Sequence, residues 1–442
     1  MPTPTSGRSC PFIKSSVAVT NPEHGLGRLL ARNLTLQIAS QGTAIVISVI
    51  TVGVLAHKLE VEAFGGFNFL FTFIFFFLSF NDLGIPTTLL REITQAPDRT
   101  VTLVQNMIGL RLVMAFASIA LGWAVIGWLD LPPAYRLPQL VFLLILPIQA
   151  VSTSIVVLQS RIQVGRVVAA EMTVRIVGFA VMMAAVANGK GLLWVVVSLV
   201  IGEATGAAMV LAMTWRAVRP VPRCDVGVWR HIVRMSLPLS GTSLMAAILN
   251  RVDMVLLQKM SPTSALGLTR VAHYGSAYRV PNLAERVPQM MMATVFPMMV
   301  SFAATDPAAL RRLYWKTSLH LCALALPMVA IVSVSAPYVV NVWMGPEYAP
   351  VVPLMRALIW ASALLYIALP AANLLIALRL QRINFWLMVP ATALNVGLNL
   401  FLIPTHGALG AAWATVASFA MLAIGHLIAV AIVMPKPVEA RS

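Results

Sequence analysis

Charged and amide side chains recur at helical spacing inside apolar stretches of this sequence. The clearest set lies in "YRVPNLAERVPQMMMATVFP", where Arg279, Asn282, Arg286 and Gln289 stand at positions i, i+3, i+7 and i+10. On one continuous helix this spacing places the four side chains along a single face. Lipid would not accept such a stripe, so this face is predicted to line an aqueous cavity with a functional role. A polar seam between two helices is the alternative interpretation.

A second charged pair interrupts the apolar stretch "MAAILNRVDMVLLQKM". Arg251 and Asp253 are two residues apart, so on a helix their side chains point about 200° from each other and cannot neutralise one another. Asp253 shares a face with Ser243, Ala246 and Asn250, which favours contact with another helix or with a cavity. We expect one of the two charged residues to anchor the helix and the other to line a cavity. The sequence leaves open which does which.

Further ionisable residues lie within the apolar stretches. Glu171 and Arg175 are four residues apart, a spacing at which opposite charges neutralise each other on a helix. Arg356 lies about one turn inside its stretch, and its long side chain can extend to the membrane surface. Glu203 stands among small residues and is expected to bond a neighbouring helix. Arg111 has no acid at helical spacing, which favours a cavity or a contact between helices.

Placing these charged side chains in hydrocarbon costs free energy, which a partner group or water must offset. An arginine at the centre of a membrane helix costs about 2.5–3.5 kcal/mol. The predicted spans contain six arginines and, apart from Asp82 near the inner end of span 2, four acids, so the interior is cationic overall. We therefore predict a diffuse lining that binds an anionic substrate. The candidate substrate-binding residues are Arg111, Arg175, Arg251, Asp253, Arg279, Asn282, Arg286, Gln289 and Arg356.

The composition places these residues in an integral membrane protein. The chain has 442 residues, of which 59% are hydrophobic and 10% charged, whereas soluble domains have about 25% charged residues. Its three cysteines are scattered and predict neither a disulfide framework nor a metal site. No nucleophile and base occur together, and no loop is long enough for a catalytic domain. We expect no enzyme activity, no metal and no cofactor.

Twelve apolar segments of about 20 residues, the length that crosses a hydrocarbon core, follow one another along the chain. They cover residues 34–56, 67–88, 104–128, 139–159, 168–188, 192–214, 236–258, 277–301, 317–340, 353–378, 383–403 and 408–433. The longest connections are 215–234 and about 259–276. The predicted parts are a cytoplasmic disordered tail (1–33), an N-terminal six-helix lobe (34–214), a basic cytoplasmic inter-lobe loop (215–235), a C-terminal six-helix lobe (236–433) and a cytoplasmic tail (434–442).

The net charge of +16 is explained by membrane topology. With the N-terminus inside, the inner loops and tails hold 20 of the 31 lysines and arginines, and the outer loops hold five. This is the positive-inside distribution of multi-pass membrane proteins. It predicts that both termini are cytoplasmic, and it removes any need for a nucleic-acid partner.

The two halves carry a weak internal repeat. "SQGTAIVISVI" (Ser40–Ile50) in the first span aligns with "LSGTSLMAAIL" (Leu239–Leu249) in the seventh. Repeats of six spans share one orientation, and such pairs of lobes enclose a cavity in several transporter folds. The predicted fold is therefore an all-α integral membrane protein, with twelve transmembrane helices in two six-helix lobes around a central cavity.

Six stretches carry a resemblance to a known family: "LARNLTLQIASQGTAIVI", "EAFGGFNFLFTFIFFFLSFNDLGIPTTLLRE", "RVDMVLLQKM", "VAHYGSAYRVPNL", "NVWMGPEYAPVVPLMRAL" and "LNLFLIPTHGALGAAWATVAS". In this order, from about residue 30 to 433, the chain resembles the polysaccharide (O-antigen type) flippases of the multidrug/oligosaccharidyl-lipid/polysaccharide exporter superfamily. Within the resemblance, Arg251 and Asp253 match the charged place of span 7, and Tyr274, Ala277 and Arg279 match the start of span 8. Apart from Asp82 near the inner end of span 2, spans 1 and 2 hold no charge, so no first-helix arginine or cation site is expected.

The resemblance implies alternating-access translocation of an undecaprenyl-diphosphate-linked oligosaccharide, from the cytoplasmic to the periplasmic leaflet of a bacterial inner membrane, for polysaccharide export. It also implies polysaccharide polymerase and chain-length machinery as candidate partners of a monomer. A multidrug or cation antiporter of the same superfamily is one alternative, although spans 1 to 4 lack an acid other than Asp82. A scaffold for sugar assembly that does not transport is another. The sugar repeat and the coupling ion are left open.

Overall fold

Helices are the expected structure throughout, because a backbone inside hydrocarbon must satisfy its own hydrogen bonds. The computed structural model describes residues 22–129 and 131–434, and within these residues it contains helices and no strand. The helices up to the centre of the chain are α1 (Pro22–Lys58), α2 (Val61–Asp82), α3 (Ile85–Gln95), α4 (Thr100–Trp128), α5 (Pro133–Leu143), α6 (Ile145–Ser152), α7 (Ile155–Ser160), α8 (Val164–Ala187) and α9 (Leu192–Val218). Those after it are α10 (Val226–Lys259), α11 (Ser264–Ala277), α12 (Arg279–Ala284), α13 (Arg286–Thr305), α14 (Pro307–Trp343), α15 (Val351–Ala377) and α16 (Gln381–Val433), with short 3₁₀ turns at Pro97–Arg99 and Pro346–Tyr348.

Within the described residues, ten helices are long and apolar enough to cross a membrane, or eleven if the bent α10 counts as one span. Straight, the 53 residues of α16 would measure about 80 Å, far more than one crossing needs. Gly407 divides α16, because its φ of 56° and ψ of −133° are not helical. Dividing α16 at this residue is consistent with the two predicted spans 383–403 and 408–433, and so with twelve spans.

Two boundaries differ from the sequence prediction. The first helix begins at Pro22, before the predicted start at residue 34, and residues 1–21 of the predicted tail lie outside the described residues. The stretch 259–276 was predicted to be a connection. This prediction is wrong, because Ser264–Ala277 forms α11. Thr263 caps this helix by accepting a hydrogen bond from the Leu266 N–H at 3.3 Å. Polar residues such as Arg270 and His273 lie in this stretch, so it did not match the apolar pattern from which the helices were predicted.

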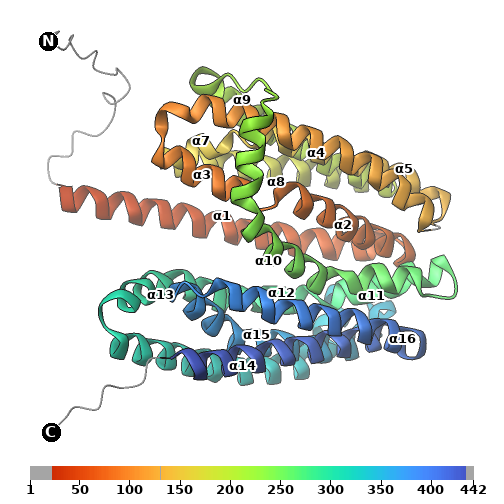
Figure 1. Cartoon of the computed structure of the whole chain (residues 1–442). Coiled ribbons are helices and arrows are strands. Elements are labelled where there is room, and N and C mark those ends of the chain that lie inside the picture. Colours follow the sequence, from red (N-terminus) through yellow and green to blue (C-terminus); the bar gives the residue numbers. More distant parts are fainter. Residues whose placement is uncertain (1–21, 130, 435–442) are drawn as a thin grey trace, which may run out of the picture.

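The helices form two packed groups (Figure 1). Helices α1–α9 make one group and α11–α16 the other, and α10 runs from the first to the second. The groups meet where α2 packs against α10 and α11. Toward the end of the molecule at which α1 begins and α13 lies, Figure 1 shows them farther apart.

Small residues allow α2 and α11 to approach closely. A Cβ atom on Gly65 would lie 1.9 Å from the Leu268 carbonyl oxygen, so only glycine fits there. A Cβ on Gly275 would lie 3.1 Å from the Asn68 side chain. Buried aromatic residues of α2 continue into one apolar core with α11 and the end of α14. The two groups are therefore sealed together at this end, and a cavity between them can open only at the other.

Candidate functional site

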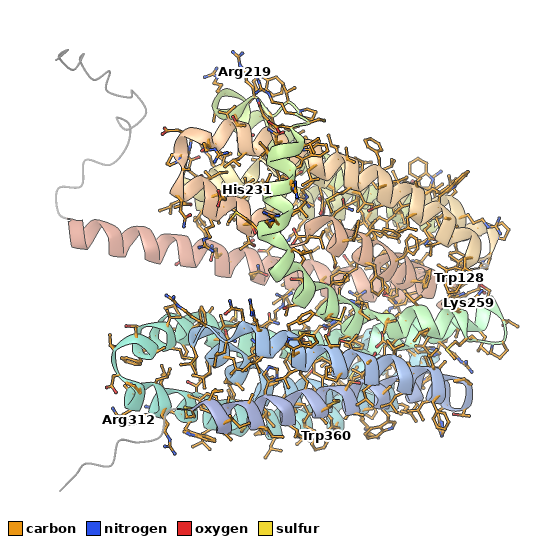
Figure 2. The ribbon with its side chains drawn as sticks, in the orientation of Figure 1. Trp128, Arg219, His231, Lys259, Arg312 and Trp360 are labelled. Atoms are coloured by element: carbon orange, nitrogen blue, oxygen red, sulfur yellow. The ribbon has the colours of Figure 1, made fainter. Side chains whose placement is uncertain are left out.

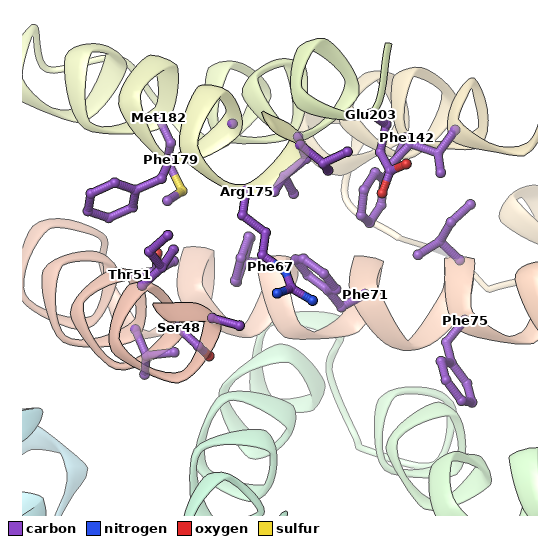
Figure 3. Close-up of a pocket in the computed structure, with 18 of the residues that line it drawn as sticks. Ser48, Thr51, Phe67, Phe71, Phe75, Phe142, Arg175, Phe179, Met182 and Glu203 are labelled. Carbon is purple, nitrogen blue, oxygen red and sulfur yellow. The ribbon is translucent and has the colours of Figure 1, made fainter. Parts of the chain in front are cut away.

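A cavity of about 470 Å³ lies where the two groups diverge. Its walls come from α1, α2, α5, α6, α8 and α9, with one residue from the second group, Arg279. Figure 3 shows its phenylalanine-rich lining, which includes Phe67, Phe71 and Phe75 of α2. Polar groups are few and come from separate helices. This combination of apolar walls and a few convergent polar groups is typical of ligand sites.

Arg175 of α8 is the central charge of this lining. Its guanidinium points from α8 toward α2, close to Phe67 and Phe71 (Figure 3). Its Nη1 donates to the carbonyl oxygen and to the hydroxyl of Ser40, at 3.2 and 3.3 Å. The expected neutralisation by Glu171 is wrong, because in the described part of the chain these two side chains make no ion pair within 4 Å. Arg175 therefore has no carboxylate at ion-pair distance among the described residues, although Glu203 lines the same cavity.

Glu203 of α9 brings a carboxylate to the same wall. It lines the cavity and lies within hydrogen-bonding reach of Gln149 on α6. A second cavity of about 370 Å³ adjoins the first and also contains Glu171. Glycines bring α8 and α9 together here, since a Cβ on Gly202 would lie 2.6 Å from the Val174 carbonyl oxygen. The close packing holds Glu203 in place behind Arg175.

Arg279 and Arg251 bring positive charge from the second group. Arg279 donates from Nη2 to Asn68 Oδ1 at 3.0 Å, which places its guanidinium against α2. Arg251 of α10 lies 5.1 Å from the ring centroid of Phe75, a cation–π contact. It is also close enough to Arg279 for the two like charges to interact. Three guanidinium groups thus gather near one cavity, from three different helices.

Asp253 does not belong to this lining. It is completely buried and accepts hydrogen bonds from the Tyr274 hydroxyl, from the Met254 N–H at 2.8 Å and from Thr415 at 3.4 Å. These bonds join α10 to α11 and α16. Asp253 thus joins three helices in the core, whereas Arg251 lies against Phe75, one of the residues that line the cavity.

Short interruptions divide the predicted span 8 in the structure. Helix breaks at Tyr278 and Glu285 separate α11, α12 and α13, because Pro281 and Pro288 have no N–H to continue the backbone bonding. Arg279 turns into the cavity, whereas Arg286 and Gln289 are exposed and Asn282 is half-buried. The interruptions are slight, because Ser264–Thr305 still runs as one helix long and apolar enough to cross a membrane. One shared face for the four side chains stays a prediction.

A larger cavity of about 790 Å³ lies at the divergent end of the groups. Gln37, Ser40 and Gln41 of α1 line one side, and Met290 and Thr294 of α13 line the other. Glu171 reaches this cavity as well as the second one. The lining is polar on the side of α1 and apolar to neutral on the side of α13. It forms a passage between the groups next to the arginine-containing cavity.

Comparison with known protein families decides the identity of the chain. A family model described as "Polysaccharide biosynthesis protein" matches residues 30–303, more than half of the chain. The chain belongs to this family. None of the curated proteins compared with it matches.

Solved structures similar to this family member are transporters and flippases of one superfamily. An inward-facing multidrug resistance MATE family transporter of the MOP superfamily has 13% sequence identity and a TM-score of 0.74, covering 87% of this chain and 94% of that one. The lipid II flippase MurJ, in an inward closed conformation, has 12% identity and a TM-score of 0.75, covering 90% and 87%. An outward-facing MATE transporter has 16% identity and a TM-score of 0.64, covering 91% and 94%. At these identities the similarity establishes the fold.

Two predicted site residues of this family member lie apart from the cavity. Arg111 is 6% exposed and donates to the Asn81 carbonyl oxygen at 3.2 Å and to Thr153 Oγ1 at 2.7 Å. It joins α4 to α2 and to the α6–α7 turn. Arg356 is exposed and donates to the Ser333 carbonyl oxygen at 2.9 Å, joining α15 to α14. Both guanidinium groups are held by backbone and hydroxyl oxygens and make structural contacts.

Sequence reasoning missed part of the lining. Gln149 carried no recognisable signal, because a single glutamine in an apolar stretch is common. Glu203 was noted, but it was interpreted as a bond between helices. The aromatic run "FGGFNFLFTFIFFFLSF" in α2 was a usable signal. It supplies several lining residues, although lipid tails also accept phenylalanine, so the run alone does not locate a cavity.

Proposed function

We propose that this chain moves an undecaprenyl-diphosphate-linked oligosaccharide across a bacterial inner membrane by alternating access, as part of polysaccharide export. The family membership and the superfamily fold support a transporter of this kind. The single observation that carries the substrate class is the gathering of Arg175, Arg251 and Arg279 at one apolar cavity.

The electrostatics of the cavity favour an anion. Like charges repel strongly in a low dielectric, and a diphosphate between the guanidinium groups would relieve that repulsion. The lipid diphosphate is an anion attached to an apolar chain, so it fits a site with apolar walls and few charges. In this arrangement the sugar occupies the cavity, and the polyprenyl chain stays in the lipid between the two groups.

The conformation supports the direction of loading. The groups are sealed where α2 meets α11, and cavities lie toward the end that the charge distribution predicts to be cytoplasmic. The similarity is higher to the inward-facing MATE structure than to the outward-facing one, with TM-scores of 0.74 and 0.64. We infer an inward-facing state that receives substrate from the cytoplasmic leaflet.

Translocation in proteoliposomes tests the proposal. The substrate is a fluorescent undecaprenyl-diphosphate oligosaccharide, and the readout is its accessibility to an enzyme outside the vesicles. We expect Arg175→Gln and Arg279→Gln each to lower the initial rate about tenfold or more, as loss of a charge-assisted contact predicts. The matched control, Arg356→Gln, removes the same charge from a site away from the cavity and should retain the rate. Wild-type rates in both cavity variants would refute the proposed site.

A multidrug or cation antiporter is the second candidate, and Glu203 is the observation in its favour. A carboxylate in the cavity of the first group is what a cation substrate would need. In the same vesicles, uptake of a cationic drug that is lost in Glu203→Gln but kept in Arg175→Gln would favour this alternative. Substrate movement that depends on Arg175 and not on Glu203 favours the lipid-diphosphate proposal.

A further inference from the structure

The first part of α10 is unlike the other long helices. Residues Val226–Leu237 form a segment bent by 60° from Ser240–Lys259, the part that crosses between the groups. In Figure 1 this segment runs across the first group, nearly at right angles to its helices. Most of it lies within the predicted inter-lobe loop 215–235, which the distribution of lysine and arginine predicts to be cytoplasmic. We refer to Val226–Leu237 as the crossing segment.

One face of the crossing segment is fixed to the first group. The Trp229 indole N–H donates to the Asn106 carbonyl oxygen at 2.9 Å, and the Asp225 N–H donates to Asn106 Oδ1 at 2.8 Å. Just before it, the Arg223 N–H donates to the Gln105 carbonyl oxygen at 3.0 Å. Ile232 on the same face is only 4% exposed. The segment therefore has a fixed position on α4.

Next to this fixed face lies a line of exposed apolar side chains. Val226, Val233 and Leu237 are 73%, 39% and 64% exposed, and on a helix they lie within about 40° of one another. Arg230 and Arg234 lie directly beside this apolar line, also exposed. With Gly227 and His231 they border a hollow of about 320 Å³. Figure 2 shows His231 on this segment and Arg219 near its start.

The acids near the hollow are already engaged. Asp225 Oδ1 accepts hydrogen bonds from the N–H groups of Gly227 and Val228 at 2.9 and 3.2 Å, as the cap of α10. Glu92 of α3 lies 3.7 Å from His231 Nε2. In the described part of the chain no carboxylate lies within 4 Å of Arg230 or Arg234. The exposed arginines of the preceding stretch, Arg216, Arg219 and Arg223, add positive charge.

We infer that the crossing segment lies in the cytoplasmic surface of the membrane and binds acidic phospholipid headgroups. An apolar line flanked by arginines is the pattern of helices that lie in the membrane interface. The apolar line enters the acyl boundary, and Arg230 and Arg234 hold the headgroup phosphates in the hollow between them. Basic segments next to the membrane attract the anionic lipids of the inner leaflet. The bound lipids hold the start of α10, the only helix that joins the two groups within the described residues.

Lipid titration of the purified full-length protein tests this inference. The delipidated protein in detergent is mixed with phosphatidylglycerol or phosphatidylcholine, and bound lipid is counted by native mass spectrometry. We expect the wild type to retain phosphatidylglycerol in preference to phosphatidylcholine. The Arg230→Gln/Arg234→Gln double variant should lose about tenfold in phosphatidylglycerol affinity. The control, Arg311→Gln/Arg312→Gln, removes two arginines near the start of α14 (Arg312 in Figure 2) and should keep the preference.

Additional measurements separate lipid binding by the arginine charges from misfolding of the variant and from binding of a free anion. The Arg230→Lys/Arg234→Lys variant keeps the charge and should retain most of the preference, which also guards against a misfolded glutamine variant. Raised salt should weaken phosphatidylglycerol binding in the wild type. Unchanged phosphatidylglycerol binding in the glutamine variant would overturn the inference. Displacement of the lipid by inorganic phosphate would also overturn it, because the hollow would then be a site for a free anion.

Discussion

At the residue scale, similar side chains serve different purposes in this protein. Arg175 and Arg279 line one cavity and Arg251 lies against its Phe75, whereas Arg111 and Arg356 bond backbone and hydroxyl oxygens elsewhere. Helical spacing predicts which face of a helix carries a residue, but not what that face meets. For this reason the sequence identified charged residues near the site and could not sort them.

Asp253 provides a test at this scale. Replacing it with alanine removes the acceptor of the Tyr274 hydroxyl and of the Met254 N–H at a completely buried position, while the Thr415 hydroxyl keeps the Ala411 carbonyl oxygen. We expect Asp253→Ala to lower the free energy of unfolding by about 1–3 kcal/mol. Asp253→Asn keeps one acceptor oxygen and should cost less. The measurement is the midpoint of thermal unfolding of the purified protein in detergent.

The opposite result would change the role of Asp253. An Asp253→Ala protein with wild-type stability but no transport would move this carboxylate from the structural framework into the transport mechanism. A stability loss with residual transport supports the anchoring role.

At the element scale, the breaks in the helices decide where side chains point. The sequence predicted span 8 as one helix, and the structure has slight, proline-associated interruptions at Tyr278 and Glu285, with Arg279 lining the cavity and Arg286 outside it. Prolines at 281 and 288 were visible in the sequence. Their effect on direction was not predictable, since a kink depends on the helices against which the broken pieces pack.

The contact between α2 and α11 holds the two helix groups together at one end of the molecule. Gly65→Ala would place a Cβ 1.9 Å from the Leu268 carbonyl oxygen, so the two helices must move apart. We expect the variant to favour opening at this end. The reporter is Thr72→Cys on α2, at a buried position, in a protein without Cys10, Cys224 and Cys322. In the Gly65→Ala variant this cysteine should react several-fold faster with a membrane-impermeant maleimide than in the parent protein.

Gly127→Ala is the matched control for this experiment. It makes the same substitution on α4, where a Cβ meets no atom within 4 Å, and should leave the labelling rate unchanged. Equal labelling in Gly65→Ala and the parent protein would show that α2 and α11 do not form the closure.

At the scale of the whole molecule, composition and charge distribution predicted most of the architecture. The low share of charged residues and the apolar segments predicted a multi-pass helical protein, and the structure confirms this fold class. What composition cannot predict is the conformational state, because both states of an alternating-access protein have the same sequence. The sealed contact at Gly65 and the cavities at the other end supply that information.

Binding of an undecaprenyl-diphosphate oligosaccharide to the purified protein tests the central claim most directly. The account predicts saturable binding that the Arg175→Gln/Arg279→Gln variant weakens by about a hundredfold, from two lost charge-assisted contacts, while Arg356→Gln leaves it unchanged. Binding of equal strength in the double variant and the wild type would contradict the account.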